Sequence, residues 1–114
     1  MELLTKELKK QLPPLYSQES VKDPIVICKF FHPLSSMAWY AIEGSPVDAD
    51  GYYDTDKKKV DFLFFGWVYS TSPEPGYFSL NEMQGVQVRG LGIERDLDFI
   101  PKRLSEVKKE HGVT

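Results

Sequence analysis

The sequence predicts an α+β fold: an antiparallel sheet of four to five strands with short N-terminal, middle and C-terminal helices, mostly on one face. Three observations support this class. Residues 60–69 hold the densest run of aromatic and β-branched residues in the chain, which is typical of a central strand. Turn-forming residues separate shorter apolar runs. Residues that cap helices precede three short segments.

The N-terminal part is predicted to contain one helix and one strand. Thr5 is expected to cap a helix over residues 6–12, where leucines recur at every fourth position. The pair Pro13–Pro14 ends it, because the residue before a proline disfavours the α conformation. Residues 25–32 are predicted to be the first strand. Its mostly apolar row is expected to face the core and consists of Val26, Cys28, Phe30 and His32.

Residues 37–43 and 60–69 are predicted to pair as a long antiparallel hairpin. The loop between them, residues 44–56, is rich in Gly, Pro and Asp, with Asp50–Gly51 as its expected tight turn. Both faces of the second strand are apolar, so we expect both to be covered, one by helices and the other less completely. The two rows are Val60, Phe62, Phe64 and Val68 with Gly66, and Leu63, Phe65, Trp67 and Tyr69.

The segment after this hairpin contains a predicted break, a short strand and a helix. Residues 72–76 hold two prolines and a glycine and are expected to end the preceding strand. Residues 77–78 form a candidate short strand. Ser79 and Glu82 have the spacing of a capping box, which predicts a short helix before Gly85.

The C-terminal part is predicted to contain a loop, a strand and a helix. Residues 86–93 include two glycines and are expected to form an ordered loop. Residues 96–100 are the predicted last strand, before Pro101. Ser105 is expected to cap a terminal helix over residues 106–110, which ends near Gly112.

Length and composition exclude several classes of protein. At 114 residues, the chain is expected to form a single domain, residues 1–114. A net charge of −3 disfavours non-specific DNA binding, which needs an excess of Lys and Arg. Cys28 is the single cysteine and has no partner for an internal disulfide, which predicts a reducing compartment. No membrane-spanning run or secretory signal is recognisable, so we expect a cytoplasmic protein without a membrane partner.

No metal or cofactor is expected. Cys28, His32 and His111 are too few, and wrongly spaced, for a zinc motif, and a buried structural cysteine is the simpler interpretation. The loop with Asp48, Asp50, Asp54 and Asp56 fails as a calcium-binding EF-hand at both ends of the ligand pattern. A solvated hairpin tip is favoured there, and cation binding by residues 48–56 stays open.

Enzymatic activity is not indicated, although the sequence leaves it open. The chain has no Gly-x-Ser-x-Gly, Walker or His-Glu-x-x-His motif. A small enzyme would act through Cys28, His32 or the loop at residues 94–96, because partners in catalysis need not be adjacent in sequence.

The charged segment at residues 89–96 is a candidate binding surface because it combines glycines with both signs of charge. The residues that would contact a partner are Arg89, Glu94, Arg95 and Asp96. The simpler interpretation is that Glu94, Arg95 and Asp96 form ion pairs that hold the loop in place.

Aromatic side chains of the predicted sheet form a second candidate surface. The candidates are Trp39, Tyr40, Phe65, Trp67, Tyr69 and Tyr77. Such rings stack on single-stranded nucleic acid in several sheet domains, but those sites also need basic neighbours. Near this hairpin only Lys57, Lys58 and Lys59 qualify, and five aspartates oppose them. Core packing is the simpler interpretation, and an exposed aromatic row would favour a protein partner.

Several short sequence motifs occur in the same order as in the bacterial family of unknown function DUF2958, which the chain resembles over roughly residues 3–107. They are Leu12-Pro-Pro-Leu-Tyr-Ser-Gln-Glu19, residues 23–26, 29–31, 35–40, 64–66 and 76–80, Gly92-Ile-Glu-Arg-Asp-Leu97 and residues 104–106. The chain departs from the family at Met37 and in the longer tip at residues 45–59. The resemblance implies a setting on plasmids, integrative elements and phages, and an accessory role in transfer or against host defence. It implies no catalytic residues.

The leading expectation is therefore a non-enzymatic mobile-element protein that binds and modulates another protein, with host defence or DNA-processing machinery as candidate targets. The first alternative is a single-stranded nucleic-acid-binding module that uses an aromatic sheet face. The second alternative is a small enzyme of unknown reaction.

Overall fold

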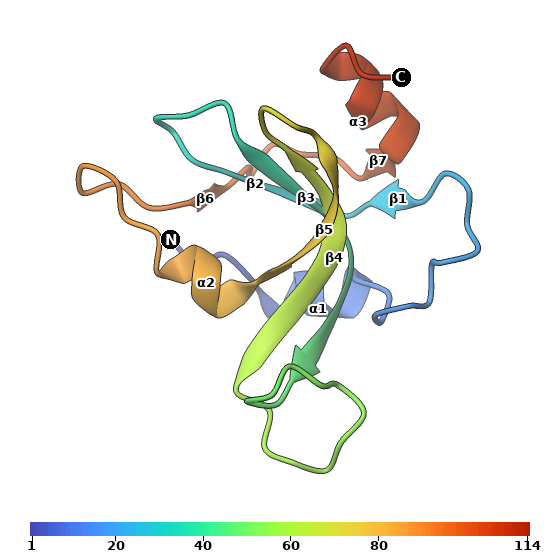
Figure 1. Ribbon diagram of the computed structural model, residues 1–114, viewed down its shortest axis with the longest axis vertical. Helices are drawn as coiled ribbons and strands as arrows, with labels where there is room; N and C mark the ends of the chain where they lie inside the picture. The colour runs from blue at the N-terminus through green and yellow to red at the C-terminus, as the bar shows by residue number, and fades with distance from the viewer.

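A five-stranded antiparallel sheet in the order β5–β4–β3–β2–β6 runs through the molecule (Figure 1). The computed structural model describes residues 1–114. The strands of this sheet are β2 (Cys28–Phe31), β3 (Ala38–Val47), β4 (Asp61–Tyr69), β5 (Glu74–Ser79) and β6 (Glu94–Arg95). A second sheet pairs β1 (Ile25–Val26) with β7 (Lys102–Arg103). The predicted α+β class with an antiparallel sheet is confirmed.

The middle strand of the sheet is β3, and its pairing with β4 runs to Val47, four residues beyond the predicted end. β4 is thus an interior strand but not the middle one. The second half of β3 has no strand on its other edge, and the N-terminal part of the chain takes that place. The N–H of Gly44 donates to the Pro13 carbonyl at 2.9 Å, and the N–H of Leu15 donates to Ser45 Oγ at 3.0 Å.

The two faces of β4 are covered to different degrees, as its residue pattern predicts. Phe62 and Phe64 on one face are almost completely buried. On the other face Trp67 is buried, but Leu63 and Phe65 remain partly exposed. The second face is therefore the one on which a surface remains open.

Two of the three helices cover the first face. They are α1 (Lys6–Gln11) and α2 (Leu80–Gln84), and both begin at predicted caps. The N–H of Leu8 donates to Thr5 Oγ1 at 3.2 Å, and the N–H of Glu82 donates to Ser79 Oγ at 3.1 Å. The core on this side consists of Leu3, Leu4, Leu12, Cys28, Phe30, Ala41, Phe62, Phe64, Phe78, Met83 and Ile93.

The third helix, α3 (Leu104–Glu110), packs on the second face through Val107, which is completely buried. The core on this side consists of Val26, Ala38, Tyr40, Ile42, Trp67 and Val107. His111 follows the helix and closes this core: its Nε2 lies 2.6 Å from the Tyr40 hydroxyl, and its ring stacks on Tyr69 at 3.8 Å. The helices thus lie mostly on one face, as expected, with α3 as the exception.

The predicted first strand at residues 25–32 is divided into two strands that belong to different sheets. The division occurs at Ile27, whose N–H donates to the Ala41 carbonyl at 2.8 Å. All four residues of the predicted core row are buried, as expected. Because the chain turns at Ile27, however, Val26 joins the core of the second face, whereas Cys28 and Phe30 join that of the first.

The predicted last strand at residues 96–100 is wrong. The strand lies earlier, at Glu94–Arg95, where it pairs with Phe30 and Phe31 of β2. It ends there because the Asp96 carboxylate accepts the N–H of Asp98 at 2.9 Å and turns the chain. The two-residue strand β7 follows, and the sequence analysis did not predict it.

Two predicted boundaries near β5 and α3 are also corrected. Strand β5 begins at Glu74, inside the predicted break, and tolerates Pro75 because β4 is its only neighbour. Helix α3 begins at Leu104 rather than after Ser105. The N–H and hydroxyl of Ser105 both donate to the Asp23 carboxylate, at 2.9 and 2.7 Å, so this serine fastens the helix to the chain before β1. The predicted end at Gly112 is confirmed, with φ at 71°.

Gly66 marks the closest approach of β4 to β3, and we expect Gly66→Ala to destabilise the fold strongly. An added Cβ would lie 1.8 Å from the Tyr40 carbonyl oxygen, which is backbone and has no room to move. The expected loss is about 3 kcal/mol of unfolding free energy, measured by urea denaturation. Gly76 is the matched control, because it pairs with Gly66 across the sheet and its added Cβ would meet only Val68 at 3.8 Å. Equal losses in the two variants would contradict this account.

His111 is expected to make stability depend on pH. Burial, and to a lesser extent the Lys29 ammonium, lower the pKa of its imidazole below the ordinary value of 6.5. The imidazole of the unfolded chain then binds the proton more tightly than that of the folded protein. The free energy of unfolding is therefore greatest above pH 6.5 and falls as the pH drops toward and through the folded pKa. Urea denaturation between about pH 7.5 and pH 5.5 should show this decline, and His111→Gln should flatten it. An unchanged slope in the variant would rule out His111 as its source.

Candidate functional site

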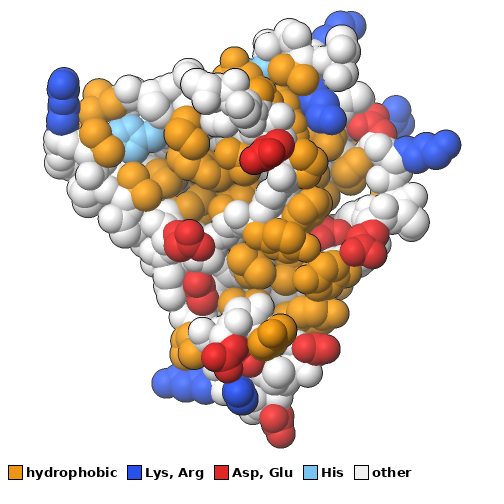
Figure 2. Space-filling model, viewed as in Figure 1, with side chains coloured by type: hydrophobic (Ala, Val, Ile, Leu, Met, Phe, Trp, Pro, Cys, Tyr) orange, Lys and Arg blue, Asp and Glu red, His pale blue; other side chains and the backbone are white.

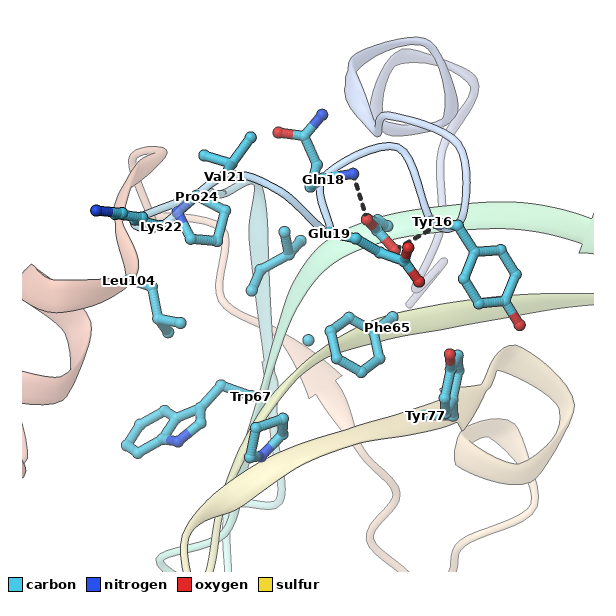
Figure 3. A pocket seen from close by; sticks show the side chains of 14 residues that line it. Tyr16, Gln18, Glu19, Val21, Lys22, Pro24, Phe65, Trp67, Tyr77 and Leu104 are labelled. Carbon is cyan, nitrogen blue, oxygen red and sulfur yellow. Dashed lines mark hydrogen bonds between the residues drawn. The ribbon is translucent and has the colours of Figure 1, made fainter.

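A groove of about 470 Å³ opens on the second face of the sheet (Figure 3). Strands β3, β4 and β5 form one side of it, and residues 13–24, which we call the connector, form the other. The volume of the groove falls within the range of ligand-binding pockets. About half of the side chains that line it are apolar. The groove is lined by Tyr16, Gln18, Glu19, Val21, Lys22, Pro24, Ile42, Glu43, Phe65, Gly66, Trp67, Pro75, Tyr77 and Leu104.

The buried carboxylate of Glu43 holds the connector over the sheet. Glu43 is only 3% exposed, and its two oxygens accept the backbone N–H groups of Tyr16 at 2.9 Å and Gln18 at 2.7 Å (Figure 3). A bulge at Ile42 shifts the register so that Glu43 lies opposite Phe65 and its side chain points to the groove side. The charge of this buried carboxylate is thus compensated by backbone donors, and the wall of the groove is fixed.

One end of the groove is aromatic and is formed by Tyr16, Phe65 and Tyr77. The rings of Phe65 and Tyr77 lie 4.9 Å apart between centroids, and those of Tyr16 and Tyr77 lie 6.5 Å apart. Tyr16 adopts a left-handed backbone conformation with φ at 70°, which is uncommon for a residue with a side chain. Tyr53 packs against the outer side of Tyr16 at 5.7 Å.

The rings at the aromatic end are accessible to solvent. Tyr16 is 46% and Tyr77 51% exposed. Their hydroxyl groups point toward each other in Figure 3. Interaction with the neighbouring Tyr16 side chain, with a contribution from burial, raises the pKa of Tyr77 to about 12.

Acidic side chains accompany the apolar ones on this face of the molecule. Figure 2 shows hydrophobic side chains gathered over the crossing of β3, β4 and β5, with acidic groups beside them and most basic groups at the margins. In the groove itself, Glu19 lies near the aromatic end, and Lys22 lies at the other end beside Pro24 and Leu104 (Figure 3).

The predicted aromatic surface is divided by the sheet. Trp39 packs on the first face, whereas the other five candidates lie on the second, namely Tyr40, Phe65, Trp67, Tyr69 and Tyr77. Tyr40 and Trp67 are 2% exposed and belong to the core, although the edge of Trp67 lines the groove. Of the six candidates, only Tyr77 both lines the groove and is exposed, at 51%.

One residue that completes the groove, Phe65, was among the predicted aromatic candidates, because it lies two positions before Trp67 and therefore on the same face of the strand. Tyr16, Glu19 and Glu43 were not predicted as site residues. These three could be found only by knowing that the connector folds back over the sheet.

The charged candidates at residues 89–96 lie away from the groove, since β6 is at the opposite edge of the sheet from β5. Arg89 is exposed in the turn between Val88 and Leu91. The guanidinium of Arg95 donates to the carbonyl groups of Glu2 and Leu3. Asp96 pairs with Lys29 at 3.9 Å. Arg95 and Asp96 therefore hold neighbouring segments in place, and Glu94 lines a separate cavity.

Cys28, His32 and His111 do not form a common site. Burial raises the pKa of the Cys28 thiol to about 12, and a protonated thiol is a poor nucleophile and ligand. His32 Nδ1 accepts the N–H of Leu34 at 3.1 Å, and its Nε2 lies 3.0 Å from the Leu91 carbonyl. No group of three or more His, Cys, Asp or Glu side chains in residues 1–114 is placed to hold a metal ion.

The aspartate-rich loop is organised by Asp48. Its carboxylate accepts the N–H groups of Asp50 and Tyr52 at 2.9 and 3.1 Å and the hydroxyl of Thr55 at 2.6 Å. The Thr55 hydrogen bond is the main reason why the pKa of Asp48 lies below its usual value. Gly51, with φ at 88°, completes the expected turn. Asp48 therefore acts as a structural residue of the hairpin tip.

None of the helices has the length and apolar character needed to span a bilayer. Comparison with curated proteins and with solved structures finds no match to this chain. A family model described as "Protein of unknown function (DUF2958)" matches residues 3–110, which is most of the chain. The protein therefore belongs to the DUF2958 family.

Proposed function

We propose that this protein is a cytoplasmic accessory protein of bacterial mobile genetic elements that binds another protein through the groove and modulates it without catalysing a reaction. The observation that carries the proposal is the exposed aromatic end of the groove. Exposed tyrosine rings beside a fixed apolar wall are typical anchors of protein interfaces. Host defence proteins and DNA-processing machinery are the candidate targets, in keeping with the setting that the family resemblance implies.

The charge of the groove favours a protein over a nucleic acid. Its three charged residues are Glu19, Glu43 and Lys22, and the whole chain carries a net charge of −3. Phosphate groups need a positive surface, and binding of single strands combines stacking with such a surface. The groove offers the rings without the basic neighbours.

The proposal predicts that a captured partner depends on Tyr77. Tagged protein is used to capture partners from a bacterial lysate, with and without nuclease, and Tyr77→Ala is compared with Tyr52→Ala. Tyr52 is the matched control because it is 61% exposed and does not line the groove. We expect at least a fivefold loss of a nuclease-resistant partner with Tyr77→Ala, since truncation of an anchor typically costs more than about 1 kcal/mol, and little change with Tyr52→Ala.

Two results would contradict the proposal. Equal capture by the two variants would place the interface outside the groove. Loss of every specific partner on nuclease treatment, together with a steep decline of binding as salt rises, would instead support the nucleic-acid-binding alternative. Circular dichroism of both variants checks that neither substitution at an exposed tyrosine has unfolded the chain.

A further inference from the structure

The aromatic end of the groove has the composition of a site for a cationic side chain. Three rings, those of Tyr16, Phe65 and Tyr77, lie within 6.5 Å of one another in successive pairs, and two of them are about half exposed. The faces of aromatic rings attract cations, most often the guanidinium of arginine, which also stacks on them. The rings therefore offer a surface on which a planar cation can lie.

Glu19 supplies a negative charge at the same place. It lines the groove beside the aromatic end and takes part in none of the ion pairs of the structure. The Glu43 carboxylate lies deeper and adds to the negative potential, although its oxygens already accept two backbone N–H groups. A carboxylate next to aromatic faces favours a guanidinium, which has five donors and a flat apolar surface.

The only basic residue of the groove does not occupy this place. Lys22 lies at the far end, and in Figure 3 its ammonium points away from Glu19. That end is otherwise apolar, with Pro24, Trp67 and Leu104. The groove thus has a cation-attracting end and an apolar end, joined along one face of the sheet.

We propose that the aromatic end binds an arginine side chain of the partner protein, while an apolar residue next to that arginine in the partner occupies the end beside Leu104. This assignment rests on the proposed function and names the chemistry of the partner segment. The rings hold the guanidinium by stacking, and Glu19 pairs with it. The wall fixed by Glu43 keeps the two ends at a constant separation.

The experiment uses the full chain and defined peptide probes. The blocked tripeptide acetyl-Leu-Arg-Leu-amide is titrated into ¹⁵N-labelled protein, and the same peptide with citrulline in place of arginine is the control. Citrulline has nearly the same shape but no charge. We expect resonance shifts at Tyr16, Glu19, Phe65 and Tyr77, and binding about two- to fivefold tighter for the arginine peptide, as an exposed cation–π contact provides.

Two variants separate the charge from the rings. Glu19→Gln should reduce the preference for arginine over citrulline, whereas Glu74→Gln should not, because Glu74 is exposed and does not line the groove. Tyr77→Phe should keep the preference, because it retains the ring, and Tyr77→Ala should lose it. Equal affinities for the two peptides, shifts confined to residues outside the groove, or no shifts at all would overturn the proposal.

The two experiments distinguish failure of the arginine site from failure of the proposed function. A nuclease-resistant partner that depends on Tyr77, together with no arginine preference, would keep the protein-binding function and remove the cation site. An arginine preference without any captured partner would keep the site and leave the proposed function without its support.

Discussion

The long pairing of β3 with β4 is the constraint on which the rest of the structure depends. The two strands approach so closely at Gly66 that no side chain fits there, and a single bulge at Ile42 changes which residues face each side. Before the bulge, β3 contributes Tyr40 to the core under α3. After it, β3 directs Glu43 and Ser45 to the connector. One strand thus organises a packed core and an open groove along its length.

The groove is stable because its polar groups are satisfied within the protein. The backbone N–H groups of Leu15, Tyr16 and Gln18 would otherwise need water, and each finds a side-chain acceptor on β3. An unpartnered carboxylate at the position of Glu43 would be costly, and two N–H donors remove that cost. The apolar wall can therefore remain exposed without the connector being mobile, which is the preorganisation that favours binding.

The sequence predicted the elements that local chemistry determines. The caps at Thr5 and Ser79 and the two-sided burial of β4 depend on residues close to one another in the chain, and all were found. The division of residues 25–32 between two sheets, and the two-residue strand β6, depend on which distant strand is available for pairing. The groove was missed for the same reason. In the sequence, Glu43 has the character of a polar residue at the end of a strand, and only the folded structure shows that the connector lies above it.

Strand β5 sets a limit on how any partner can approach. It is the open edge of the sheet beside the groove, where a foreign strand would otherwise extend the ladder, but Pro75 offers no N–H and Pro73 precedes the strand. The prolines therefore disfavour main-chain pairing with an incoming strand at this edge. Under the proposed function, recognition at the groove would therefore depend on side chains, and a partner would be selected by its sequence rather than by its ability to form a strand.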